Sequence, residues 1–156
     1  LSGSGKSTWI QKHLPDHQVV SLDDLREELA DERSDQRQNG RVRQLAKERL
    51  KEHLRAGRKV VWDATGLRRD FRSQVAGLGF AYRALVTMVA FLPDPEALVR
   101  RNRSRNHPVP EEVLKYQLEA LEWPDCDEAH RLLVLDLSGD LVASYGRLGE
   151  GPVYGL

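Results

Sequence analysis

The chain has 156 residues, enough for one domain with a real core, and 40% of them are hydrophobic. Lys and Arg together number 24, as do Asp and Glu, so no overall basic charge attracts nucleic acid and any such partner must meet a local basic patch. One cysteine excludes an internal disulfide, and no apolar run reaches membrane-spanning length. We therefore expect a single domain over residues 1–156, cytoplasmic and without a membrane partner.

Residues 1–8, Leu-Ser-Gly-Ser-Gly-Lys-Ser-Thr, match a phosphate-binding P-loop, G-x-x-x-x-G-K-[ST], without its first glycine. The first strand and that glycine are expected to precede residue 1, and residues 6–13 are expected to form the following helix. Lys6 would reach the β- and γ-phosphates, and the Ser7 hydroxyl would ligate Mg²⁺. The residues expected to bind the nucleotide are Gly3, Ser4, Gly5, Lys6, Ser7 and Thr8. The motif predicts a bound triphosphate, ATP or another NTP, and leaves the acceptor open.

Residues 18–21 read as a strand and Asp24 begins a predicted helix that extends to residue 32. Ligands of open α/β sheets bind at the carboxyl ends of strands, where Asp23 could accept a proton from a hydroxyl and Arg26 could hold an anion. In the alternative interpretation, Asp23 is only the N-cap of the helix and Arg26 lies in solvent. The residues by themselves leave both interpretations open.

The middle of the chain predicts a helix over 40–55, a buried parallel strand over 59–63 and a helix over 71–79. The strand ends at Asp63, and Thr65 follows it. Three arginines at the same rim are candidates for contacts to an RNA or DNA backbone: Arg68, Arg69 and Arg72.

A strand is expected over 82–91, and Asp94 with Pro95 marks the next helix as its N-cap and first residue. Arg101 and Arg105, four residues apart, would share one face of this basic segment. Mobile arginines there could neutralise a migrating phosphoryl group, or they could merely complement the helix dipole.

The last third of the chain begins with a helix at Pro110, whose apolar face is Leu114, Leu118 and Leu121. A further strand is expected over 132–137. The Gly-rich residues 138–156 read as a C-terminal hairpin or tail.

Three motifs in this order resemble the P-loop polynucleotide 5′-kinases, including the bacteriophage enzyme and the kinase module of the bacterial RNA-repair polynucleotide kinase-phosphatase. They are the P-loop itself, the D-x-x-R element from Asp23 to Arg26, and the basic R-N-x-x-R element from Arg101 to Arg105. Residues 61–67 resemble the family's strand-ending D-x-T-N segment, with Gly66 in place of the asparagine. The resemblance covers about residues 1–137.

The resemblance implies roles for individual residues. Asp23 would be the general base on the 5′-hydroxyl, acting with Lys6 and Arg105 in catalysis. Arg26 would grip the acceptor phosphate on the 3′ side, and Asp63 and Thr65 would lie beside the acceptor. Arg101 and Arg105 would contact the donor phosphates from a lid.

The implied fold is a P-loop NTPase-type parallel sheet of about four to five strands, flanked by helices and carrying a helical lid. The implied function is ATP- and Mg²⁺-dependent phosphorylation of 5′-OH RNA or DNA ends in repair, alone or with fused or associated repair domains. A kinase of small-molecule hydroxyls and a non-catalytic NTP-binding regulatory module remain alternatives. Neither the choice between RNA and DNA nor the oligomeric state follows from the sequence.

Overall fold

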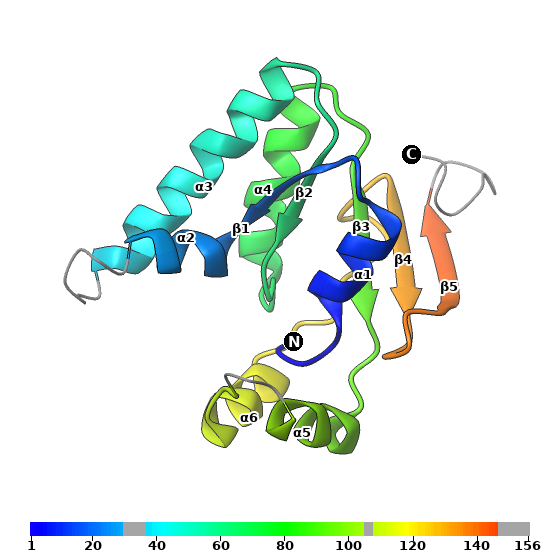
Figure 1. The fold of residues 1–156 in the computed structure, drawn as a ribbon. Helices are drawn as coiled ribbons and strands as arrows, with labels where there is room; N and C mark the ends of the chain where they lie inside the picture. Colours follow the sequence, from blue (N-terminus) through cyan, green and yellow to red (C-terminus); the bar gives the residue numbers. More distant parts are fainter. Residues whose placement is uncertain (30–36, 105–107, 147–156) are drawn as a thin grey trace. The chain divides into compact units, whose positions relative to one another are not determined.

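The computed structural model of the chain describes residues 1–29, 37–104 and 108–146. The chain folds into two compact units, Leu1–His13 with Thr65–Leu156, and Leu14–Ala64. Each unit combines helices with a parallel pair of strands (Figure 1), which confirms the predicted α/β class. No helix within the described ranges is both long enough and apolar enough to cross a membrane.

The smaller unit is a two-stranded parallel sheet with helices. Strand β1 (Gln18–Ser21) pairs with β2 (Val60–Asp63), and Ser21 is aligned with Asp63 at their carboxyl ends. Helix α2 (Leu22–Leu29) follows β1 directly, and α3 (Arg37–Arg55) packs against α2 and both strands. The packed face of α3 is apolar because every fourth residue is buried, as seen at Val42, Ala46 and Leu50.

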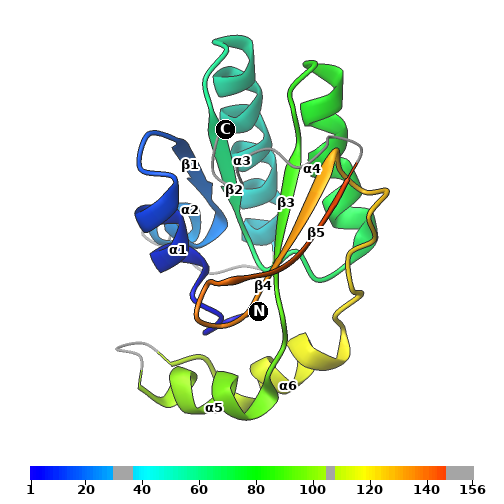
Figure 2. The same cartoon turned by 90° about the vertical axis from the view of Figure 1, so that its right-hand side faces the viewer.

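The larger unit is built on β4 (Arg131–Leu135), which lies between two other strands (Figure 2). It pairs in parallel with β3 (Thr87–Phe91) and antiparallel with β5 (Leu141–Gly146). Residues 132–135 are all buried, as expected of a central strand. The helices of this unit are α1 (Lys6–His13), α4 (Arg69–Ala81), α5 (Pro95–Arg103) and α6 (Glu111–Glu119).

An apolar cluster joins the P-loop to helices α5 and α6. Leu1 is packed with Leu98 of α5 and Leu114 of α6. The predicted apolar face of α6 is confirmed for Leu114 and Leu118, whereas Leu121 packs against the same cluster from beyond the end of the helix. Burial of these side chains fixes the beginning of the P-loop to the two helices.

Several predicted boundaries differ from the structure by one to three residues, and the start of β3 differs by five. Strand β3 begins at Thr87 rather than at Tyr82, because Tyr82 and Ala84 still donate their main-chain N–H groups to the last carbonyls of α4, at Leu78 and Gly79. Arg83 between them has φ of 56°, which is incompatible with a strand. Helix α2 begins at Leu22, two residues before its predicted start.

Candidate functional site

The P-loop takes the main-chain form that its two glycines permit. Gly3 has φ of 78° and Gly5 has φ of 92°, a left-handed conformation that is open to glycine and strained for other residues. The chain turns at these positions and enters α1 at Lys6. The N-terminal end of a helix offers N–H groups without intrahelical acceptors and a partial positive charge, which together favour a phosphate.

The side chains of the P-loop point in different directions. Ser4 is only 1% exposed, and its Oγ donates to the Leu1 carbonyl oxygen at 2.9 Å. Lys6 Nζ donates to the same oxygen at 3.0 Å, so one carbonyl holds both groups. Ser7 and Thr8 are exposed at the start of α1. Of the two serines after Gly3, Ser7 is therefore the one whose hydroxyl is accessible to a metal.

Arg101 of α5 lies against the P-loop. Its Nη1 atom is 3.7 Å from the point where a β-carbon on Gly5 would stand, and it donates to the Leu137 carbonyl oxygen at 2.6 Å. The β-carbon of Arg101 also lies 3.9 Å from the corresponding point on Gly3. The structure thus brings the predicted lid arginine beside both glycines. Arg105, its predicted partner, lies outside the described residues.

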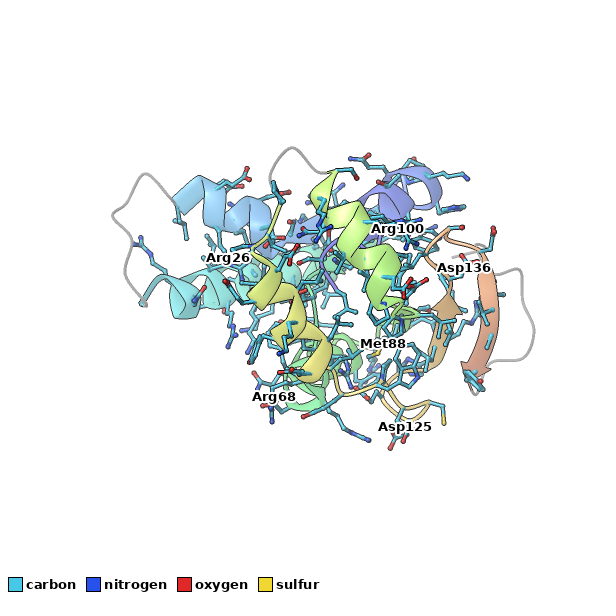
Figure 3. All side chains as sticks on the ribbon, turned by 90° about the horizontal axis from the view of Figure 1, so that it is seen from below. Arg26, Arg68, Met88, Arg100, Asp125 and Asp136 are labelled. Carbon is cyan, nitrogen blue, oxygen red and sulfur yellow. The ribbon has the colours of Figure 1, made fainter. Side chains whose placement is uncertain are left out.

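The neighbouring basic residues of α5 have acidic partners. Arg100 pairs with Glu96 at 3.7 Å, on the exposed surface seen in Figure 3, where Arg100 is labelled. Arg103 pairs with Glu111 at 2.8 Å. These exposed ion pairs contribute little to stability. Because Arg100 and Arg103 pair with acidic residues, Arg101 is the arginine of α5 that is directed at the P-loop.

Two buried amides near the P-loop were not anticipated from the sequence. Asn102 is 2% exposed, and its side chain exchanges two hydrogen bonds with the main chain of Val109, at 2.8 and 3.0 Å. Gln117 is 8% exposed and exchanges two hydrogen bonds with Ser2, at 2.8 and 3.0 Å. The sequence did contain one signal of the burial of Gln117, since this residue stands on the apolar face of α6, three residues after Leu114.

Three of the four acceptor-side residues, Asp23, Arg26 and Asp63, lie in the smaller unit, at or just after the carboxyl ends of its two strands. Asp23 is in the first turn of α2, two residues after Ser21, and Arg26 forms an ion pair with it. The side chains are 86% and 47% exposed for Asp23 and Arg26, so solvent reaches both (Figure 3, Arg26). Asp63, aligned with Ser21, is half-buried.

The capping interpretation of Asp23 is wrong in its detail. The Ser21 hydroxyl accepts the Asp24 N–H at 3.2 Å, which is the bond an N-cap residue makes, and Asp23 lies inside the helix. The Asp23 carboxylate is therefore not needed to begin α2. Thr65, the other predicted substrate residue, is exposed and belongs to the larger unit.

The three arginines proposed to contact a nucleic-acid backbone have acidic partners, and Arg72 must be removed from the candidates. Arg72 and Glu128 form a buried ion pair with side chains 8% and 1% exposed, and the Nε–Oε2 distance is 2.8 Å. Arg69 donates to both carboxylate oxygens of Asp127, at 2.7 and 2.9 Å. Arg68 lies 3.4 Å from Glu122. The sequence showed the basic cluster but not the acidic segment that faces it.

The carboxylate of Glu128 is held in its charged form. Burial by itself would raise its pKa, but hydrogen bonds from Arg72 and from the Asp125 N–H, with the attraction of Arg72 and Arg69, outweigh burial and lower the pKa from 4.5. Arg72 also donates to the carbonyls of Gly66, Leu67 and Glu122. This network is structural: it ties the segment after β2 and the segment before β4 to α4.

The residues of the larger unit fit a magnesium-bound nucleoside triphosphate. Gly3 and Gly5 keep β-carbons out of the loop, the helix end and Lys6 supply positive charge, and Arg101 adds a second cation beside Gly5. The exposed Ser7 hydroxyl is an oxygen ligand of the kind Mg²⁺ prefers.

Comparison with known proteins agrees with this site. The model of a family described as "AAA domain" matches residues 1–124. That family is P-loop NTPase-like and includes polynucleotide kinase modules. None of the curated proteins compared with the chain matches it. The match spans the P-loop, the smaller unit, Arg101 and helix α6, and it indicates a nucleotide-binding, kinase-like domain.

Proposed function

Because the chain belongs to this AAA domain family of P-loop NTPase-like proteins, we propose that it is an ATP-dependent kinase of 5′-hydroxyl ends of RNA or DNA. One observation carries the choice of acceptor. Asp23 and Arg26 stand together at the carboxyl end of β1, beside the aligned end of β2, and neither is required to cap α2. A base paired with an anion-binding arginine suits an acceptor that has both a hydroxyl and a phosphate.

The proposed roles divide between donor and acceptor groups. The P-loop and Lys6 hold the triphosphate, and Asp23 takes the proton of the 5′-hydroxyl. The hydroxyl oxygen bonds to the γ-phosphorus while the bond from that phosphorus to the β–γ bridging oxygen breaks, and ADP leaves. Arg101 and Arg105 neutralise the charge of the migrating phosphoryl group.

Magnesium, with Ser7 as a protein ligand, would neutralise charge on the β- and γ-phosphates. Asp63 and Thr65 are proposed to position the acceptor. We place the reaction in the healing of nucleic-acid ends in the cytoplasm, either alone or with fused or associated repair domains.

The exposed Asp23–Arg26 ion pair supports this assignment. Arg26 neutralises the carboxylate while no acceptor is bound. A phosphate of an incoming strand can bind the guanidinium through two parallel hydrogen bonds, so it competes with Asp23 for Arg26. Binding of the acceptor phosphate to Arg26 would thereby free the Asp23 carboxylate to act as the base.

The direct test is transfer of label from γ-labelled ATP to a 5′-OH oligonucleotide. Asp23→Asn should lower kcat by about 10²- to 10⁴-fold, the usual contribution of a general base. Asp24→Asn is the matched control, because it removes the adjacent carboxylate from the same turn of α2 and should retain activity. No transfer by the wild type, or equal rates for the two variants, would refute the proposal.

Arg26 separates the proposal from the alternative of a small-molecule kinase. A neutral small acceptor offers this arginine no anion, whereas nucleoside 3′-phosphates should be accepted far better than nucleosides. Arg26→Gln should remove most of that preference, because it deletes the charge that recognises the phosphate. A non-catalytic regulatory module would instead bind ATP and transfer phosphate to no hydroxyl.

A further inference from the structure

Gln117 lies where the second half of α6 meets the P-loop. Gln117 is 8% exposed, and the oxygen and the nitrogen of its side-chain amide both bond to one residue, Ser2. The Oε1 atom accepts the Ser2 main-chain N–H at 2.8 Å, and the Nε2 atom donates to Ser2 Oγ at 3.0 Å. A flipped amide would place an NH₂ group against the main-chain N–H, so these two bonds fix its orientation.

The Ser2 N–H belongs to the same peptide group as the Leu1 carbonyl. A trans peptide is planar, and its N–H and C=O point in opposite directions. One side of this peptide is held by Gln117, and the other side receives Ser4 Oγ and Lys6 Nζ, at 2.9 and 3.0 Å. Gln117 therefore sets the orientation of this peptide group. That orientation fixes the position of the Leu1 carbonyl, which accepts the hydrogen bond from the Lys6 ammonium.

The position of Gln117 is itself fixed by its surroundings. Leu114, one turn earlier on α6, packs against Leu98 and Leu1. The main chain just before α6 is tied to α5 through the two hydrogen bonds between Asn102 and Val109. Helix α5 also carries Arg101, so the helix pair contacts the P-loop through a cation and an amide.

We propose that Gln117 is a positioning residue for phosphate binding, which holds the Leu1–Ser2 peptide and through it the ammonium of Lys6. The proposal rests on the phosphate-binding part of the proposed function and not on the identity of the acceptor. If the proposal is correct, the affinity for the triphosphate depends on Gln117 although this residue contacts no phosphate.

The first test is binding of Mg²⁺ATP, measured by NMR titration because this method reaches millimolar dissociation constants. Gln117→Leu leaves the Ser2 N–H without its buried acceptor and should weaken binding by about tenfold or more. Ser2→Ala keeps the main-chain bond and loses only the hydroxyl, so its binding should change by less than about threefold. Equal effects of the two substitutions would overturn the proposal.

The second test is a double-mutant cycle with Lys6→Met. If Gln117 acts through Lys6, Gln117→Leu should have little further effect on Mg²⁺ATP binding once the ammonium is gone. Fully additive losses would show that Gln117 has only a structural role, and would refute the proposal.

The controls separate this proposal from general loss of stability. Leu133→Ala, in the buried centre of β4, should lower stability as much or more while retaining affinity for Mg²⁺ATP. Gln117→Met fills similar space and replaces Gln117→Leu if the latter fails to fold, as judged by circular dichroism. Failure of the wild type itself to bind ATP would refute the proposed function, whereas binding by the wild type and by Gln117→Leu alike would refute this inference alone.

Discussion

Removal of the buried carboxylate of Glu128 should be among the most destabilising single changes in the larger unit. Glu128→Leu leaves the Nε and Nη2 atoms of Arg72 without their charged partner, in a side chain only 8% exposed. Breaking a buried ion pair from one side costs about 3–5 kcal/mol, a large part of the roughly 5–15 kcal/mol that stabilises a domain. With a urea m-value of about 2 kcal/mol/M, the midpoint should fall by roughly 1.5–2.5 M.

Urea unfolding followed by circular dichroism measures this shift. The exposed pair between Arg69 and Asp127 provides the control, because its side chains are 49% and 60% exposed and Asp127→Ala should leave the midpoint unchanged. The double variant Arg72→Met/Glu128→Leu should recover part of the loss, since no uncompensated charge remains. The reasoning fails if Glu128→Leu shifts the midpoint no more than Asp127→Ala does.

Three further outcomes are expected. Because the pKa of Glu128 in the folded protein is lowered from 4.5, its contribution to stability is complete above pH 4.5 and is lost as the pH falls through the folded-state pKa. The measurement is the urea midpoint at a series of pH values from 6 to 3, and a midpoint that stays constant over this range would contradict the prediction. The hydrogen bond with Asp125 raises the pKa of the exposed Cys126 thiol, so Asp125→Asn should accelerate its alkylation by iodoacetamide at pH 8, and an unchanged rate would count against it. Gly3→Ala should cost about 1–2 kcal/mol of stability, read by urea unfolding, because φ of 78° is strained for alanine; a stability equal to that of the wild type would exclude strain at this position.

Much of the fold could be predicted because its signals are local. Lys6–His13 and Gln18–Ser21 begin and end as predicted, since a P-loop, a proline and a short apolar run define them within a few residues. Asp94 is confirmed as the N-cap of α5, as its side chain accepts the Ala97 N–H at 2.9 Å. The predicted start of β3 was wrong because the end of α4 depends on main-chain hydrogen bonds, which the spacing of apolar residues in the sequence does not reveal.

The candidate site was predictable to the extent that it follows motifs. The P-loop and Arg101 were predicted, and the structure brings them together. Gln117 was missed because its partner is 115 positions away in the chain. Arg72 was mistaken for a surface arginine, although it shares a buried helix face with Ala76 and Gly79, and that spacing was visible in the sequence.

The contact between Lys6 and the Leu1 carbonyl has a consequence for the free protein. An ammonium that already has an acceptor at 3.0 Å does not require buffer phosphate or another anion to hold the loop in shape. A triphosphate would then bind by exchange, with its oxygens replacing a carbonyl, and little of the main chain would have to become ordered. Such a loop loses less entropy on binding than a flexible one, so more of each phosphate contact remains as affinity.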